Sequence, residues 1–149
     1  MNEETKNIKR NTRDKRPEQV KEFEERVLEI KRVSKKTKGG NNIAFTSLVV
    51  VGNKKGSVGV GYAKALNVTD AIHKAVRKAN ASLIDISLTN GSIAHAVSAK
   101  YGADKVLLKP APEGTVIIAG EAVRSVVELA GVENVSYKML GANNKITNV

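Results

Sequence analysis

The residues of this sequence that could do chemistry are mainly lysines and arginines, and one short segment concentrates them. Residues 31–38 contain five cations and no acidic side chain. Such a cluster favours phosphate binding, because each neutralised phosphate releases counterions condensed on a nucleic acid. Two glycines directly after it would let an RNA backbone approach closely. We therefore predict an RNA-binding loop between two strands, made of Lys31, Arg32, Ser34, Lys35, Lys36, Lys38, Gly39, Gly40 and Asn41. The simpler alternative is a charged hairpin that is only solvated.

A second group of cations falls on a predicted helix that begins near residue 67. Apolar residues from Ile72 to Leu83 repeat at helical spacing, and Asn67 or Thr69 could cap the helix. Opposite this apolar stripe, cations three and four residues apart form one basic face. Further cations are expected in the turn before the helix and in a turn between strands. The candidate RNA ligands therefore also include Lys54, Lys55, Lys64, Lys74, Arg77 and Lys78. An ordinary solvated face is the alternative for the helix cations.

The sequence gives no support for a catalytic, metal or cofactor site. It contains no Cys, which excludes disulfides and Cys-based zinc sites, and its two histidines, His73 and His95, are distant in sequence. The glycine-rich segment 52–61 lacks the Gly-Lys pair of a P-loop and the third glycine of a dinucleotide fingerprint. We predict that these glycines serve turns and close strand packing, that the chain is not an enzyme, and that it uses no cofactor.

The overall composition points to a nucleic acid as the first partner to consider. The 149 residues carry a formal net charge of +10, with a pI near 9.9, which attracts polyanions. With no Trp, two Phe and three Tyr, recognition by base stacking is disfavoured. No apolar run approaches the ~20 residues that cross a bilayer, and the first residues lack the apolar core of a secretory signal. We expect no membrane partner and a cytoplasmic location.

The elements that position the cations follow from hydrophobic patterning. Residues 1–22 contain almost no apolar side chains, which predicts a disordered polar tail. Strands are predicted from Phe23 to Val33, from Ile43 to Val51 and from Ser57 to Tyr62, and the basic helix follows. The first half is therefore predicted to be a β-β-β-α domain over residues 23–86, an order that resembles the double-stranded-RNA-binding module.

The second half, residues 87–149, is predicted to be a small α/β domain. Residues 84–88 alternate in polarity, and Asn90-Gly91 predicts a two-residue hairpin leading into a strand over residues 93–100. Another strand over 105–109 is halted by prolines. A helix over residues 120–130 is expected to end at Gly131, and Val135 to Met139 form a last strand. The chain then stops near the start of what we expect to be another helix.

Five segments in this order give the sequence a specific resemblance. They are Arg32–Gly40, Phe45–Gly52, Val58–Lys64, Lys109–Thr115 and Ile118–Gly120. With their spacing, they resemble the bacterial-type family of small-subunit ribosomal protein five. The resemblance implies an α+β fold in which a double-stranded-RNA-binding-like domain precedes a second α/β domain. It also implies that the family's last helix lies beyond residue 149.

The same resemblance implies a function. A family member would be a structural constituent of the small ribosomal subunit that binds its ribosomal RNA and stabilises the head relative to the body near the neck. It would contact small-subunit proteins four and eight, lie near the mRNA at the entry channel, and influence translational accuracy with proteins four and twelve. Two alternatives remain open. One is a free double-stranded-RNA-binding regulator, and the other is an enzyme, which would need a phosphate loop that the sequence lacks.

Overall fold

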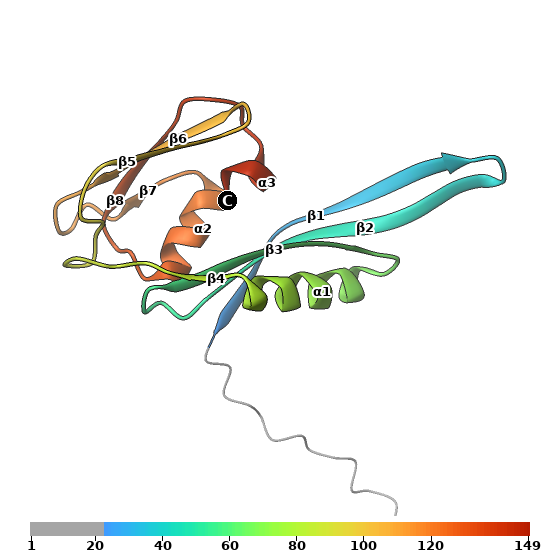
Figure 1. Ribbon diagram of the computed structural model, residues 1–149, viewed down its shortest axis with the longest axis horizontal. Coiled ribbons are helices and arrows are strands. Elements are labelled where there is room, and N and C mark those ends of the chain that lie inside the picture. Colours follow the sequence, from blue (N-terminus) through green and yellow to red (C-terminus); the bar gives the residue numbers. More distant parts are fainter. Residues whose placement is uncertain (1–22) are drawn as a thin grey trace, which may run out of the picture.

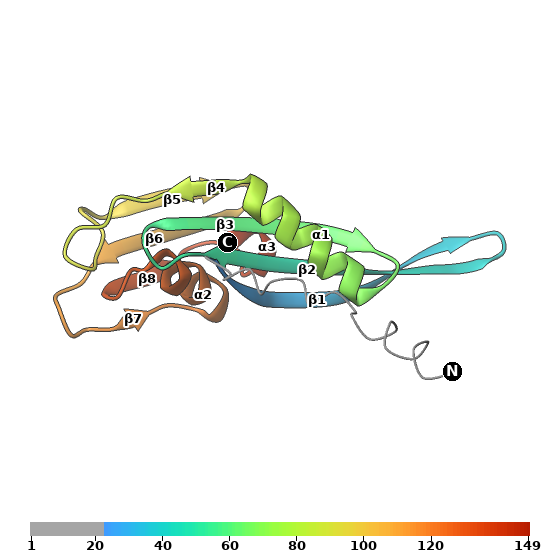
Figure 2. The ribbon, with the colours of Figure 1, turned by 90° about the horizontal axis from the view of Figure 1, so that it is seen from below.

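The structure is a computed structural model that describes residues 23–149, so the tail predicted over residues 1–22 lies outside the described residues. In the first half, β1 (Glu24–Thr37), β2 (Gly40–Gly52) and β3 (Ser57–Ala65) precede α1 (Val68–Ala81) and the short β4 (Leu83–Asp85). These strands form one antiparallel sheet in the order β1-β2-β3-β4. Helix α1 covers one face of this sheet (Figure 2).

The second half forms its own sheet and contributes a second helix. Its elements are β5 (Val97–Tyr101), β6 (Asp104–Pro110), β7 (Ile117–Ile118), α2 (Glu121–Ala130), β8 (Val135–Met139) and α3 (Lys145–Asn148). The strand order is β5-β6-β8-β7, with only the β7–β8 pair parallel. Helix α2 lies between this sheet and the first one (Figure 1). The predicted α+β fold, with a β-β-β-α part followed by a second α/β part, is confirmed. None of the described helices is long and apolar enough to cross a membrane.

Helix α1 lies unusually close to the sheet because small residues meet on both sides. Ala71, Ala75 and Ala79 are fully buried, and they face the glycines of β3. A Cβ atom placed on Gly61 would lie 2.8 Å from the backbone nitrogen of Ala79, and one on Gly59 would overlap the carbonyl oxygen of Ala79. The prediction that the glycines of segment 52–61 serve close packing is confirmed at these two positions.

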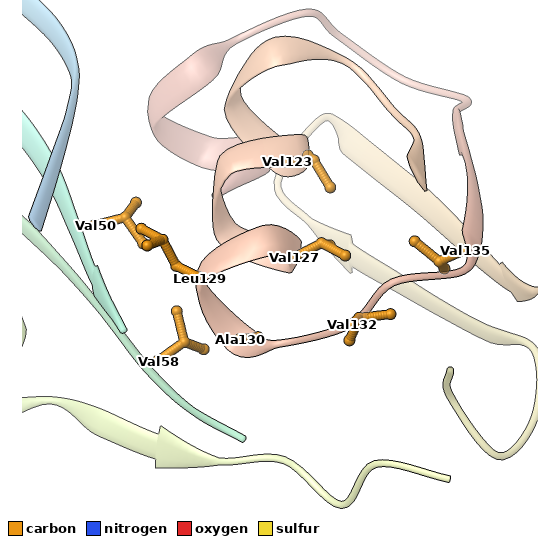
Figure 3. Close-up of a cluster of buried hydrophobic side chains, with 8 residues drawn as sticks. All are labelled: Val50, Val58, Val123, Val127, Leu129, Ala130, Val132 and Val135. Carbon is orange, nitrogen blue, oxygen red and sulfur yellow. The ribbon is translucent and has the colours of Figure 1, made fainter. Parts of the chain in front are cut away.

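One hydrophobic cluster joins the two halves of the chain. Val50 and Val58 from the first sheet pack with residues of α2 and the segment after it: Val123, Val127, Leu129, Ala130, Val132 and Val135. Figure 3 shows Leu129 pointing from α2 toward Val50, while Val127 points toward the second sheet. Helix α2 therefore buries two faces, one against each sheet, and ties them together.

The prediction of a hairpin around Asn90-Gly91 is wrong, because the segments on either side of the turn do not pair with each other as strands. The turn itself is present. Asn90 and Gly91 both have positive φ, 50° and 70°, as a two-residue hairpin turn requires. However, only one isolated bridge, between Thr89 and Ser92, flanks it. Residues 83–85 instead extend the first sheet beside β3, and residues 97–101 pair with β6. The free edge of β3 and the following strand β6 are the stronger pairing partners.

Candidate nucleic-acid interface

The predicted basic loop is not a loop but the outer part of a long hairpin, so that prediction is corrected. β1 and β2 pair from Glu24 opposite Gly52 to Thr37 opposite Gly40, and the reversal takes only residues 38 and 39. The hydroxyl of Thr37 donates to the carbonyl oxygen of Gly40 at 2.9 Å across this turn. The backbone of Gly40 has φ 134°, a value that favours glycine.

The outer part of this hairpin projects from the body of the molecule. β3 stops pairing with β2 where Ala65 faces Phe45. Beyond that point only residues 33–37 and 40–44 remain, paired with each other. We call these ten residues and the turn between them the ribbon. Five residue pairs extend about 17 Å, and Figures 1 and 2 show the ribbon reaching away from both helices.

Nearly all of the ribbon's side chains are exposed, and so are the cations at its base. Lys31, Arg32, Lys35, Lys36 and Lys38 are all exposed. Within residues 23–149 only one of these five has an ion pair: Lys31 lies 3.0 Å from the carboxylate of Glu29. The structure therefore brings together nine of the predicted RNA ligands, the five cations with Ser34, Gly39, Gly40 and Asn41.

The cations predicted on α1 form a separate basic surface. Lys74, Arg77 and Lys78 are exposed on the solvent side of the helix, away from the buried alanines. The ammonium group of Lys78 donates to the backbone oxygen of Tyr62 in β3 at 3.0 Å, which holds it beside that strand. Figure 2 shows α1, which carries these cations, over the first sheet and apart from the ribbon.

Lys64 does not lie in the turn before α1, as predicted, because β3 extends through it. Its backbone pairs with Thr46, and the neighbouring Ala63 and Ala65 are buried. Side chains alternate along a strand, so Lys64 faces the side of the sheet opposite the helix. The sheet therefore separates it from the α1 cations.

Lys54 and Lys55 lie at the far end of the β1–β2 ladder, about 40 Å from the turn of the hairpin. The ammonium group of Lys54 pairs with Glu24, which lowers the pKa of that carboxyl. The backbone nitrogen of Lys54 donates to the carbonyl oxygen of Leu129 at 2.9 Å. Lys55 is exposed, and its backbone nitrogen donates to Asn53 Oδ1 at 2.8 Å. The structure thus places Lys54 in the contact between the two halves.

This contact is the part of the molecule that sequence reasoning missed. Arg26 in β1 donates to the carboxylate of Glu128 in α2 at 2.5 Å, and Arg124 donates to the same carboxylate at 2.9 Å. The two guanidinium groups, Arg26 first, lower the pKa of Glu128. The backbone nitrogen of Gly56 donates to Ala130 at the end of α2. The predicted left-handed cap at Gly131 is present, with φ 89°. This cap was the only feature of the contact between the halves that the local sequence indicated. The other contacts join segments far apart in the sequence.

Comparison with known proteins identifies the family. Residues 23–87 match the family model described as ribosomal protein S5, N-terminal domain, and residues 99–149 match ribosomal protein S5, C-terminal domain. The chain belongs to the ribosomal protein S5 family. The resemblance inferred from the five sequence segments is therefore confirmed. All of the candidate RNA ligands lie within the part that matches the S5 N-terminal domain.

Individual S5 relatives are similar over most of this chain. It is 50% identical over 128 residues to small ribosomal subunit protein uS5 of Thermotoga maritima, covering 86% of this chain and 72% of the relative. It is 53% identical over 136 residues to the protein of the same name from Mycoplasma pneumoniae. This alignment covers 91% of this chain and 62% of the relative. It is 58% identical over 125 residues to the protein of that name from Mycoplasma genitalium. This alignment covers 84% of this chain and 59% of the relative. The chain thus spans about three fifths of the length of the Mycoplasma relatives.

Proposed function

We propose that this chain is a structural constituent of the small ribosomal subunit and that it binds small-subunit ribosomal RNA through the β1–β2 hairpin. The observation that carries the proposal is the projecting ribbon, whose exposed cations Lys35, Lys36 and Lys38 have no ion pair with a carboxylate of residues 23–149. The names of the relatives, small ribosomal subunit protein uS5, support the assignment to that subunit.

The chemistry of the hairpin fits a phosphate backbone better than it fits bases. Its ligands are ammonium and guanidinium groups with small polar residues, and no aromatic ring lies between residues 31 and 42. Structured RNA is recognised largely by shape and by phosphate and ribose contacts. Release of counterions by the cations would supply affinity. The two glycines at the turn leave room for a ribose-phosphate chain to approach the backbone.

In this proposal the two halves of the chain have different roles. We assign RNA binding mainly to residues 23–86, with the α1 surface of Lys74, Arg77 and Lys78 as a weaker second contact and Lys64, Lys54 and Lys55 as peripheral ones. Residues 87–149 would form the second domain. The ion pair of Arg26 with Glu128 and the core around Leu129 support a fixed orientation of the two halves. A rigid body of this kind suits a protein that holds the head of the subunit relative to the body near the neck.

The finer parts of the proposal rest on the family. They are contacts with small-subunit proteins four and eight, a position near the mRNA at the entry channel, and an influence on translational accuracy together with proteins four and twelve. A ribosomal ambiguity assay would test the last part. Variants of the ribbon that misplace the protein should change the rate of misreading.

A salt titration tests the RNA contact directly. The purified chain is bound to small-subunit ribosomal RNA on filters at increasing salt. The triple variant Lys35→Ala, Lys36→Ala, Lys38→Ala should reduce the slope of log affinity against log salt by about 2 to 3, from ~0.7 to 0.9 for each lost phosphate contact. A control that removes three exposed cations from the second half, Lys100→Ala, Lys105→Ala, Lys138→Ala, should change the slope by less than about one. Equal slopes for the wild type and the ribbon variant would remove the hairpin from the interface.

Sedimentation separates the ribosomal function from that of a free regulator. In a sucrose gradient of a cell extract, the tagged chain should run with the small subunit. A chain that stays at the top of the gradient while still binding double-stranded RNA would favour the regulator.

A further inference from the structure

We propose that the face of the second sheet opposite α2 is a docking surface for an acidic protein, with the apolar side chain of Leu107 at its centre. The inference rests on the proposed function, because the partner is sought within the small ribosomal subunit. None of the candidate RNA ligands lies on this face.

The strands of the second sheet place several lysines on this one face. Leu108 in β6 and Tyr137 in β8 pack against the hydrophobic cluster around α2. Because side chains alternate along a strand, their neighbours in β6 and β8 lie on the opposite face. Residues opposite each other in an antiparallel pair share a face, and Lys100 in β5 is opposite Lys105. The face therefore contains Lys100, Lys105, Lys109 and Lys138, together with Ser98, Leu107, Ile118 and Ser136.

This face is accessible to a partner. Helix α2 lies between the two sheets, so the opposite face of the second sheet is turned away from the first sheet (Figure 1). All four lysines are exposed. The side chain of Ile118 is 56% exposed. A partner could therefore reach the face without any rearrangement of the described residues.

The positive charge of this face has no counterpart in the described part of the chain. Lys100 and Lys105 lie directly opposite each other, and like charges in that position destabilise a sheet. Lys138 is opposite Leu107, which places it diagonally across from Lys105. None of the side chains on the face is acidic, and no carboxylate of residues 23–149 forms an ion pair with these lysines. A partner that supplies carboxylates would relieve this repulsion.

The arrangement of charge around an apolar centre fits a protein better than RNA. Leu107 lies between Lys105 and Lys109, whose Cα atoms are about 13 Å apart along β6, and Lys138 is beside it on the next strand. Protein interfaces combine an apolar centre with a polar rim, and complementary charge selects the partner. A phosphate backbone would give Leu107 and Ile118 no apolar contacts. The partner is therefore expected to present carboxylates around an apolar side chain.

Carbodiimide crosslinking tests this inference, because the reagent condenses a lysine amine with a carboxylate that is in contact with it. Small subunits that contain the tagged full chain are isolated from a sucrose gradient, crosslinked, digested and analysed by mass spectrometry. Lys105 and Lys138 should be linked to Asp or Glu residues of one neighbouring protein. Lys105→Arg keeps the charge but removes the amine, so its links should be lost while those of Lys138 remain. Lys74 and Lys78 on α1, which we assign to phosphates, are the comparison and should give no such links.

Three results would overturn the inference. If the chain is in the subunit but neither Lys105 nor Lys138 is linked to another protein, the inference fails while the proposed function stands. If the variant Lys100→Ala, Lys105→Ala, Lys138→Ala lowers the salt slope for ribosomal RNA by about 2 to 3, this face binds RNA instead. If the chain is absent from the subunit peak, the proposed function fails, and the inference fails with it.

Discussion

Arg26 and Glu128 are 102 residues apart in sequence, yet the guanidinium of the first donates to the carboxylate of the second at 2.5 Å. Arg26 lies in β1 of the first sheet and Glu128 lies in α2 of the second half, so this ion pair spans the contact between the halves of the chain. Both side chains are about one third exposed, which limits the strength of the pair. Their geometry nevertheless couples the stability of the two halves.

Removal of Arg26 should loosen this contact. We expect Arg26→Ala to lower the free energy of unfolding by about 1 kcal/mol, since the pair is hydrogen-bonded but partly screened by solvent. Urea unfolding at neutral pH would measure it. Arg124→Ala removes the other partner of Glu128, an exposed pair within one helix, and should lower it by only a few tenths of a kcal/mol. An equal decrease in the free energy of unfolding for both variants would contradict a stabilising role of the Arg26–Glu128 pair between the two halves.

The same pair should contribute to acid sensitivity. Arg26 and Arg124 hold the pKa of Glu128 below its ordinary value in the folded protein. The stabilisation is therefore complete above the unfolded pKa, near 4.3, and is lost as the pH falls through the lower folded value. Urea unfolding from neutral pH down to about 3 should show a smaller acid loss in Arg26→Ala than in the wild type. A parallel shift of both curves would show that Glu128 is not responsible.

Gly61 should not accept even one additional carbon atom. A Cβ there would overlap the carbonyl oxygen of Ala75 and lie 2.8 Å from the nitrogen of Ala79, so α1 would have to move. We expect Gly61→Ala to lower the free energy of unfolding by about 2 to 4 kcal/mol. Gly39→Ala is the control, because nothing lies within 4 Å of its added carbon, and it should change stability by less than about 0.5 kcal/mol.

The backbone of Val116 has a left-handed conformation that glycine adopts more easily than valine. Its φ is 65°, which strains a β-branched side chain by roughly 1 to 3 kcal/mol. The side chain is 58% exposed, so little burial would be lost on its removal. Val116→Gly should therefore raise the thermal midpoint by a few degrees. The neighbouring Thr115→Gly should lower it, because that hydroxyl donates to the carbonyl oxygen of Pro112 at 2.8 Å.

The α1 surface should matter less for RNA than the ribbon. The triple variant Lys74→Ala, Arg77→Ala, Lys78→Ala removes the same charge as the ribbon variant. Because one of these cations already donates to Tyr62 and a flat helix face reaches fewer phosphates, we expect a slope decrease of about one rather than two to three. Filter binding of both triple variants to the same RNA would compare them. A larger decrease for the α1 variant would reverse this ranking of the two surfaces.

The helices could be predicted from the sequence because their signals are local. The apolar spacing marked both α1 and α2, Asn67 is the residue before the first, and Gly131 ends the second in the left-handed conformation. The β-forming residues also predicted β1, β2 and β3 in their order before α1, although not their full lengths, and this order predicted the fold of the first half.

The shape of the candidate site could not be predicted, because it depends on which backbones pair. Residues 33–44 are mostly polar, so no alternating apolar pattern marks them as strands, and the sequence predicts a loop where the structure has the paired ribbon. The true partner of residues 83–85 is β3, far away in sequence. Likewise, nothing next to Lys54 shows that Glu24 and Leu129 lie beside it. The types of residue in the site could be predicted from the sequence one by one, but the hairpin that they form depends on the register of β1 and β2.

The turn at residues 53–56 supplies backbone donors to the last carbonyls of α2, at Leu129 and Ala130. A helix cannot satisfy these carbonyls by itself. During synthesis the turn leaves the ribosome about 75 residues before them, and chains fold from the N-terminal part onward. The first sheet would then fold first and offer these donors when α2 emerges. The end of α2 would form last, so the chain would fold in the order in which it is translated.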